Sequence, residues 1–424
     1  MLRRHGPAMW ADVGARWTVV APLEALPSWS ALDWTAQVRA VRTTDDIPSD
    51  LPFPGGLVGW FGYEAGAWMD RMAAPAPAPT IDGVPFALPV AWFGRARAAI
   101  VQDHREGRTH LVGEREAVAA LAGLVAGVGS APPPDAPTAR RIYETPGGHY
   151  EDGVRAVLGH LRAGDCYQVN LARRLDFTQA GDAFDLWRRL RRLNPARRGM
   201  LVETPHGAVV SNSPELLLSV RRERPRPGAP VLGSPRWITR STPIKGTASA
   251  RGEPAVRRAA AAALLASAKE RAELTMIVDL VRADLGHVAA PGTVVAGPRR
   301  VGAMGHVWHA AQRVDAVLAE GKDAADAFRV VFPAGSVTGA PRLRAMDVIR
   351  RLEEGPRGVY CGAVGWFGVD GSARFNVAIR TITVIGGHAS FHVGAGLVLG
   401  SVPAREYQET VLKAERLALA LEAH

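Results

Sequence analysis

The spacing of hydrophobic and polar residues along the chain predicts both strands and helices, without a strict alternation of the two. Runs rich in β-branched and aromatic residues indicate strands, and hydrophobic residues three or four positions apart indicate helices. The predicted strands cover residues 17–20, 56–62, 90–101, 166–177, 199–203, 207–211, 215–220, 359–367, 374–384 and 389–398. The predicted helices cover residues 116–126, 148–163, 184–193, 254–284 and 342–353, with a last one from residue 403. This succession favours an α+β fold over a doubly wound parallel sheet.

One proline-rich segment interrupts the pattern. Residues 127–139 read GVGSAPPPDAPTA and hold four prolines, which suit neither a helix nor a central strand. We therefore predict an N-terminal region of residues 1–126, a linker of residues 127–139 and a larger region of residues 140–424. A second irregular stretch, residues 223–236, indicates a loop between two strands.

Two glutamates extend the hydrophobic stripe of one predicted helix. Leu274, Ile277 and Val281 recur at helical spacing. Glu270 lies one turn before Leu274, and Glu273 lies one turn before Ile277. Glu270 and Glu273 are three positions apart and are therefore neighbours on one face. Carboxylates that point inward are costly unless a cation meets them.

The last predicted helix repeats this arrangement with Glu406, Glu409, Lys413 and Leu417. Two such pairs could together hold a hard cation such as Mg²⁺, which prefers oxygen ligands. A single Glu-x-x-Glu pair is more often a solvated surface feature, so both interpretations stay open at this point.

Lys245 stands in the segment TPIKGT, at the predicted end of a strand and beside a tight glycine turn. A partly desolvated amine near other cations has a lowered pKa and can act as a nucleophile. The segment is not a phosphate-binding loop, because it does not fit the Gly-x-x-x-x-Gly-Lys-Ser/Thr pattern. Taken alone, a lysine in such a turn is usually solvated.

Composition and charge exclude several classes of protein. The 424 residues carry a net charge of +10, yet 47 of the 51 basic residues are arginine and they are scattered along the chain. No nucleic-acid-binding motif accompanies them, so we expect no nucleic-acid partner. No apolar run reaches the length of a membrane span. The only cysteines, Cys166 and Cys361, and the lack of a secretory signal favour a reducing, cytoplasmic location.

The chain resembles the chorismate-utilising enzymes, in particular component I of aminodeoxychorismate synthase, the sister of component I of anthranilate synthase. The resemblance is strong from residue 140 onward and weaker before it, and it covers most of the chain. The order of the motifs is more specific than any one of them. The motifs are FPGGLVGWFGYEAG (53–66), GDCYQVNLARR (164–174), NSPELLLSV (212–220), TPIKGT (242–247), AELTMIVDLVRADLGHV (272–288), VWHAAQRV (307–314), FPAGSVTGAPRLRAMDVI (332–349), RGVYCGAVGWFG (357–368), FNVAIRTI (375–382) and GAGLVLGSVPAREYQETVLKA (394–414).

This resemblance implies a fold of two packed antiparallel β-sheets with helices on the outside. It also implies that residues 140–424 bind chorismate and that residues 1–126 correspond to the N-terminal part of anthranilate synthase component I. The family binds chorismate with Mg²⁺ through two glutamates from each of two helices. These fall on Glu270, Glu273, Glu406 and Glu409, and Lys413 would add positive charge near them.

Further site residues follow from the same resemblance. The second carboxylate of the substrate would meet Arg380 and Tyr360, since an arginine offers paired donors to a carboxylate. His309 falls on the family's active-site histidine. The remaining residues expected at the substrate are Thr247, Thr338 and the backbone of Gly394, Ala395 and Gly396.

The subclass depends on Lys245. Anthranilate synthases usually read Pro-Ile-Ala-Gly-Thr, whereas this chain reads Pro-Ile-Lys-Gly-Thr. In the enzymes that it resembles, the lysine attacks carbon 2 of chorismate and expels the hydroxyl at carbon 4. Ammonia then adds at carbon 4 and displaces the lysine. Glu215 would be the general acid and base for the departing hydroxyl.

The chain departs from the family pattern at several places, among them Asn194–Gly199, Ala283, Arg342 and Gly400. It also lacks a glutaminase, so nitrogen would come from ammonia or from a separate glutamine amidotransferase subunit. The resemblance favours amination of chorismate at carbon 4 for the p-aminobenzoate, folate or a secondary-metabolite pathway. Two alternatives stay open: an anthranilate, aminodeoxyisochorismate or isochorismate-type synthase, and a binding protein without catalysis.

Overall fold

The structure is a computed structural model of the chain. It describes residues 6–27, 29–30, 33–42, 51–69, 80–81, 84–126, 132–223, 236–305 and 307–422. Most of the second irregular stretch, residues 224–235, lies outside the described residues, as do residues 127–131 of the predicted linker.

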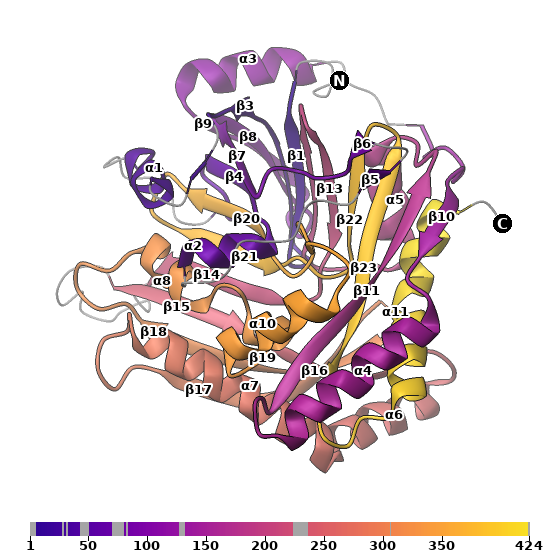
Figure 1. Cartoon of the computed structure of the whole chain (residues 1–424). Coiled ribbons are helices and arrows are strands. Elements are labelled where there is room, and N and C mark those ends of the chain that lie inside the picture. Colours follow the sequence, from indigo (N-terminus) through magenta and orange to yellow (C-terminus); the bar gives the residue numbers. More distant parts are fainter. Residues whose placement is uncertain are drawn as a thin grey trace.

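Two large antiparallel sheets form the centre of the molecule, and helices lie outside them (Figure 1). The strands of the first sheet are, in spatial order, β10 (Arg140–Glu144), β11 (Gln168–Thr178), β23 (His388–Leu397), β22 (Thr381–Ile385), β13 (Gly207–Asn212), β12 (Gly199–Thr204), β1 (Ala8–Val13), β2 (Trp17–Pro22), β8 (Ala98–Asp103) and β9 (Arg108–Gly113), with β19 (Gly339–Ala340) paired to β11. Those of the second sheet are β16 (Ile244–Ser249), β18 (Val307–Val317), β15 (Trp237–Thr242), β14 (Leu216–Arg222), β21 (Ala373–Val377), β20 (Ala363–Gly368), β4 (Gly56–Phe61), β7 (Ala91–Ala96) and β3 (Glu24–Ala25), with β17 (Val295–Met304) paired to β18. A separate short pair joins β5 (Thr80–Ile81) to β6 (Val84–Pro85).

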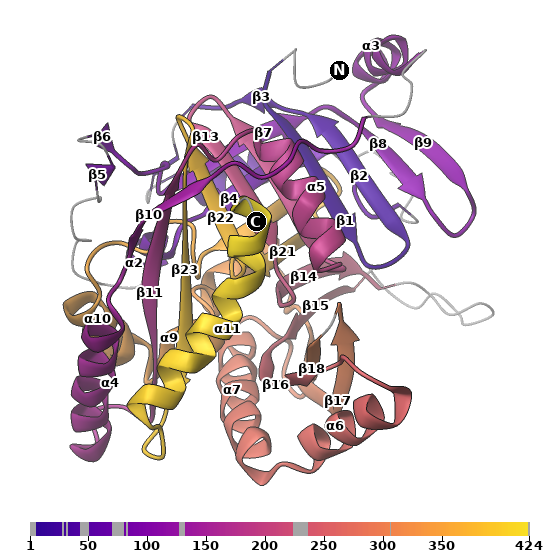
Figure 2. The same ribbon diagram turned by 90° about the vertical axis from the view of Figure 1, so that its right-hand side faces the viewer.

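The helices cover the outer faces of the two sheets (Figure 2). Those against the first sheet are α4 (Gly147–Arg162), α5 (Ala183–Leu193), α10 (Arg342–Leu352) and α11 (Pro403–Leu421). Those against the second sheet are α6 (Pro254–Ala266), α7 (Ala268–Gly286) and α8 (Ala324–Val331). Two further helices contact the first sheet: α3 (Arg115–Val125) lies against β8 and β9, and the short α9 (Gly335–Thr338) against β11 and β19. The others are α1 (Trp34–Ala40) and α2 (Gly66–Met69). The predicted α+β class with two antiparallel sheets is therefore confirmed.

Strands from both sides of the predicted linker pair directly with each other. In the first sheet β1 pairs with β12, and in the second β4 pairs with β20. The N-terminal strands therefore widen the two sheets that the later part of the chain builds. The division of the chain into two regions with a linker at residues 127–139 stays a prediction. In the structure, strands from both regions take part in each of the two sheets.

One predicted helix and two predicted strands each correspond to two separate elements in the structure. The helix predicted over 254–284 is two helices, because Ser267 ends α6 and its Oγ accepts the backbone N–H of Glu270 at the start of α7. The strand predicted over 374–384 is β21 and β22, which belong to different sheets. The strand predicted over 90–101 likewise divides into β7 and β8. Hydrophobic alternation continues through such corners, so it does not reveal where a strand changes sheet.

Aromatic side chains form much of the core around β4. Phe61 is fully buried, and its ring lies 5.0 Å from that of Phe93 and 4.7 Å from that of Phe328. Phe332 and Phe375 complete this contact from the later part of the chain. Phe61 thus joins the N-terminal region to the region after the linker.

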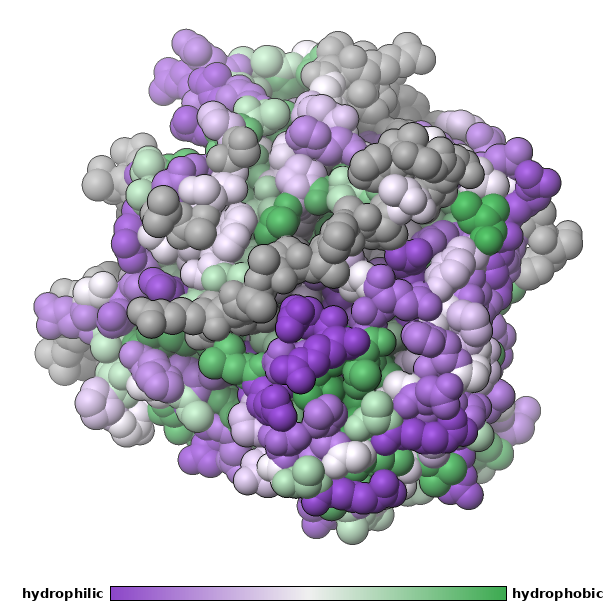
Figure 3. Space-filling model, in the orientation of Figure 1, coloured by the Kyte–Doolittle hydropathy of each residue, from purple (hydrophilic) through white to green (hydrophobic). Residues whose placement is uncertain are grey.

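The surface on the side of Figure 1 is mostly hydrophilic, with small hydrophobic patches between charged residues (Figure 3). Among the described residues, no helix is both long and apolar enough to cross a membrane.

Replacing Phe61 tests whether the two regions fold as one unit. Phe61→Ala is expected to lower the free energy of unfolding by about 3–5 kcal/mol, because it leaves a cavity between both regions. Urea unfolding followed by circular dichroism and tryptophan fluorescence measures this loss, and both signals should shift together. Tyr167→Ala is the control, since this side chain is 71% exposed. A loss below about 1 kcal/mol, or a shift of one signal alone, would contradict the shared core.

Candidate active site

A cavity of about 250 Å³ gathers residues from both sheets and from α7, α9 and α11. Thirteen of the fifteen site residues proposed from the sequence line it. They are Glu215, Lys245, Thr247, Glu270, Glu273, His309, Tyr360, Arg380, Gly394, Gly396, Glu406, Glu409 and Lys413. Residues that lie up to about two hundred positions apart in the sequence therefore face one space.

The other two proposed residues, Ala395 and Thr338, do not line the cavity. Successive residues of a strand point to opposite faces, so Ala395 packs against α4 while Gly394 and Gly396 face the cavity. Thr338 is fully buried, and its hydroxyl donates to the carbonyl of Ala334. Ser336, two residues earlier, reaches the cavity instead.

A bulge in β16 turns Lys245 into the cavity. Ile244 pairs with Ala311 and Thr247 with His309, so three steps on β16 match two on β18. Gly246 lies within this bulge at a φ of +81°, where a side chain would be strained. A Cβ on Gly246 would also lie 2.5 Å from Glu270 Oε2. The glycine of the TPIKGT segment therefore lets the carboxylate approach the backbone next to the lysine.

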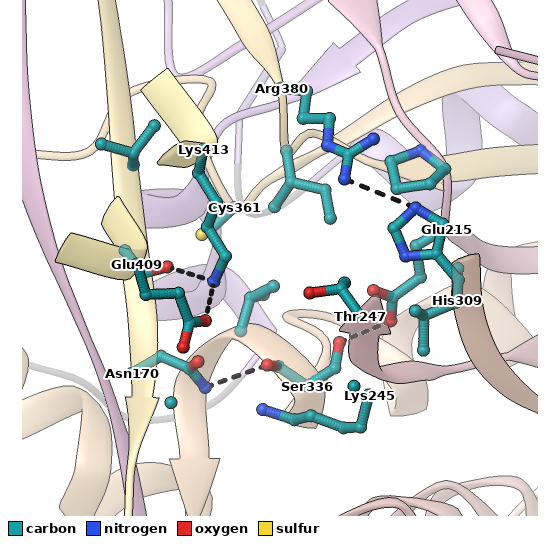
Figure 4. Close-up of a pocket in the computed structure, with 18 of the residues that line it drawn as sticks. Asn170, Glu215, Lys245, Thr247, His309, Ser336, Cys361, Arg380, Glu409 and Lys413 are labelled. Carbon is teal, nitrogen blue, oxygen red and sulfur yellow. Dashed lines mark hydrogen bonds and ion pairs between the residues drawn. The ribbon is translucent and has the colours of Figure 1, made fainter. Parts of the chain in front are cut away.

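The side chain of Lys245 is half-buried and reaches into the cavity (Figure 4). A Cβ on Gly396 would lie 2.7 Å from its Nζ, so glycine leaves the space that the amine occupies. Burial lowers the pKa of Lys245, Glu273 opposes this shift, and Lys413 adds to it. A lowered pKa increases the fraction of neutral amine, which is the form that can attack carbon.

Glu215 comes directly after Pro214 at the start of β14 and is buried. Its Oε1 accepts a hydrogen bond of 2.6 Å from the hydroxyl of Ser336. Burial raises the pKa of Glu215 to about 7, although Ser336 and Lys245 act against this rise. A carboxyl group with such a pKa can both give and take a proton near neutral pH.

His309 and Arg380 form the opposite wall of the cavity. Their side chains meet at 3.4 Å between His309 Nε2 and Arg380 Nη2. Burial, helped by the charges of Arg380 and Lys413, lowers the pKa of His309 to about 3, so the ring is neutral at physiological pH. Its Nδ1 is buried without a hydrogen-bond partner among the described residues.

Arg380 stands where the chain leaves β21 for β22, at a φ of +52°. Burial lowers the pKa of its guanidinium to about 10, which still leaves it charged at neutral pH. Within the described part of the chain, no carboxylate forms an ion pair with it. A buried cation of this kind suits an anionic group of a ligand, and a carboxylate can accept two hydrogen bonds from it.

The four glutamates lie on two helices that meet at the cavity, two on α7 and two on α11. Burial raises the pKa of Glu273 and of Glu406, and the neighbouring carboxylates Glu270 and Glu409 add to the rise. For Glu409 burial is outweighed by Lys413, whose Nζ lies 2.7 Å away, and its pKa is lowered.

These glutamates suit Mg²⁺ by the chemistry of their donors, because all are oxygen ligands and their repulsion would be relieved by a cation. In the part of the chain that the structure describes, no three acidic, histidine or cysteine side chains already converge as a metal cluster. The carboxylates thus form two pairs that face one cavity.

The sequence did not single out several residues of the cavity. Asn170, Ser336 and Arg357 line it, and so does His392, whose ring stacks on Tyr360 at 5.3 Å. Asn170 is a polar residue between the apolar Val169 and Leu171, which was an available signal. Cys361 also lines the cavity, but burial raises the pKa of its thiol to about 12, which disfavours the reactive thiolate.

Comparisons with known proteins agree with this geometry. The family described as chorismate binding enzyme matches residues 13–419. The chain is 37% identical to anthranilate synthase component 1 of Streptomyces coelicolor, over 98% of this chain and 81% of that protein. It is 35% identical to aminodeoxychorismate synthase component 1 of Klebsiella aerogenes, over 88% of this chain and 78% of that protein.

A solved structure shows the same fold. Anthranilate synthase component I from Streptococcus pneumoniae superposes with a TM-score of 0.78 at 24% identity, over 97% of this chain and 92% of the other.

The titration of Glu215 can be observed directly by infrared difference spectroscopy. The protonated carboxyl band of Glu215 should disappear between about pH 6 and about pH 8, since its pKa is about 7 against an ordinary 4.5. The same raised pKa means that the stability which Glu215 contributes at low pH is lost as the pH rises from about 4.5 through 7. Burial raises the pKa of Glu64 to about 7 as well, so Glu215→Gln should lose only the Glu215 part of the spectral change, and the exposed Glu116→Gln should keep all of it. An unchanged spectrum in Glu215→Gln would contradict the assignment.

Proposed function

Because the chain belongs to the chorismate binding enzyme family, we propose that it aminates chorismate at carbon 4 to give 4-amino-4-deoxychorismate. The observation that carries this proposal is the half-buried Lys245, which faces the cavity beside Glu215 and Glu273 and has a lowered pKa. A lysine in this place can form a covalent bond to the substrate, which an alanine cannot.

The proposed reaction has two substitutions. The neutral amine of Lys245 attacks carbon 2 of chorismate, and the hydroxyl at carbon 4 leaves as water with a proton from Glu215. Ammonia then attacks carbon 4, the bond between carbon 2 and Lys245 breaks, and the amine leaves with its electron pair. The sum is chorismate plus ammonia to aminodeoxychorismate plus water. The pKa of Glu215 near 7 supports its exchange of protons in both steps.

The cavity residues have distinct proposed tasks in binding chorismate. Arg380 and Tyr360 would hold one carboxylate, supported by the backbone of Gly394 and Gly396. Neutral His309 would orient Arg380 and the ring of the substrate. The remaining predicted contacts are Thr247 and Lys413.

We further propose that Glu270, Glu273, Glu406 and Glu409 hold Mg²⁺ together with the other carboxylate of the substrate. When bound, the metal ion would neutralise the negative charge that the four glutamates and this carboxylate bring together. Lys413 offsets part of that charge through Glu409.

Nitrogen would be supplied as ammonia, either free or from a separate glutamine amidotransferase subunit. The name of the Klebsiella aerogenes relative, component 1, supports a second component of this kind. The product would serve p-aminobenzoate formation, in folate biosynthesis or in a secondary pathway.

A second candidate function is anthranilate synthesis. It is favoured by the Streptomyces coelicolor relative, which matches 98% of this chain. That reaction needs no covalent lysine, so the position of Lys245 discriminates between the two.

A product assay with excess ammonium separates these functions. The purified chain with chorismate and Mg²⁺ should form aminodeoxychorismate, and a chelator should abolish the reaction. Lys245→Ala should lower kcat by about a hundredfold or more, because it removes the nucleophile. Lys322→Ala is the matched control, since Lys322 is exposed and distant from the cavity. Anthranilate as the product, or full activity of Lys245→Ala, would refute the proposal.

A further inference from the structure

We propose that the buried ion pair of Arg357 and Glu353 is a positioning element for Glu215, which it controls through Asn170 and Ser336. The proposal rests on the proposed function, because it concerns the proton exchange assigned to Glu215. None of these four residues was expected at the site from the sequence.

The ion pair fills a gap along one edge of β11. This edge pairs with β10 from Leu175 onward and with β19 at Gln168 and Val169, so no strand covers the residues between. There Arg357 Nη2 donates to the carbonyl of Asn170 at 2.7 Å, and Glu353 Oε1 accepts the N–H of Ala172 at 2.8 Å. The two side chains replace the missing strand and fix this part of β11.

The guanidinium of Arg357 contacts a carboxylate and two aromatic rings. Its Nε and Nη2 donate to the Glu353 carboxylate at 2.9 and 2.6 Å, and both side chains are almost fully buried. Its guanidinium lies 4.6 Å from the ring of Tyr63 and 5.8 Å from that of Tyr360. Lysine could not reproduce this geometry, because its single amine lacks the planar set of donors.

The other end of Arg357 reaches α9. Its Nη1 donates to the carbonyl of Val337 at 2.9 Å, next to Ser336. Asn170 Nδ2 in turn donates to the carbonyl of Ser336 at 2.9 Å. Arg357 is therefore hydrogen-bonded to both β11 and α9. The contact between these two elements places the hydroxyl of Ser336 2.6 Å from Glu215 Oε1.

The hydroxyl of Ser336 stabilises the charged form of Glu215, and losing it should raise the pKa of that carboxyl. The other charged or titratable groups that face Glu215 are Lys245 from β16, Arg198 before β12 and the thiol of Cys361. None of these three groups is substituted in the variants. Glu64 also titrates near 7 and accepts the backbone N–H of Arg357, so the Glu215 band is identified by its absence in Glu215→Gln, and a shift of that band reports the hydrogen bond from Ser336.

The test compares Ser336→Ala, Ser336→Thr and Arg357→Lys with the wild type. The infrared titration of Glu215 should move to higher pH by about one to two units in Ser336→Ala, and in the same direction in Arg357→Lys. Ser336→Thr, which keeps the hydroxyl, should titrate like the wild type. Arg350→Lys on the surface of α10 is the control for Arg357→Lys.

Activity with ammonium gives a second readout. Ser336→Ala and Arg357→Lys should lower kcat about tenfold with less than a threefold change in the KM for chorismate, and the alkaline limb of the kcat profile should move with the titration. An unchanged midpoint in both variants overturns the proposal, even where Arg357→Lys loses stability. If the wild type forms no aminodeoxychorismate, the proposed function fails, while the infrared midpoints still decide the positioning role.

Discussion

The burial of charged groups in one cavity between the two sheets is the constraint on which the site depends. Lys245 is half-buried beside carboxylates, and burial disfavours its charged form. The same burial raises the pKa of Glu215 to about 7. Burial in one cavity thus lowers the pKa of the amine and raises the pKa of the carboxyl, so both move towards neutral pH. Covalent catalysis with proton exchange requires groups of this kind.

The backbone makes this environment possible at a few special positions. Gly246 and Gly396 have no side chain where Glu270 and the amine of Lys245 come closest. Arg380 lies in the left-handed region at the point where the chain passes from one sheet to the other. A cation placed at such a corner can face the cavity between the sheets without interrupting either ladder of hydrogen bonds.

Much of the fold and of the site could be predicted from the sequence, for identifiable reasons. The Glu-x-x-Glu pairs stood out because carboxylates are costly on the hydrophobic face of a helix. Lys245 stood out by its place in the TPIKGT segment, and the ordered motifs placed most of the other residues. Ala395 and Thr338 do not line the cavity, since a motif alone does not show which of its residues face it. The break at Ser267 and the corner before Arg380 were missed because helical and strand periodicity continue across them. Arg357 could not be found, because its role comes from contacts with β11 and α9 that are distant in the sequence.

The covalent role of Lys245 is the central claim, and mass spectrometry tests it most directly. The chain would be incubated with chorismate and Mg²⁺ without ammonia, quenched, and digested into peptides. We expect the peptide containing Lys245 to gain the mass of chorismate less one water, and ammonium to remove this addition as aminodeoxychorismate forms. A preparation that forms aminodeoxychorismate on addition of ammonium, yet never carries the added mass on Lys245, would contradict this claim.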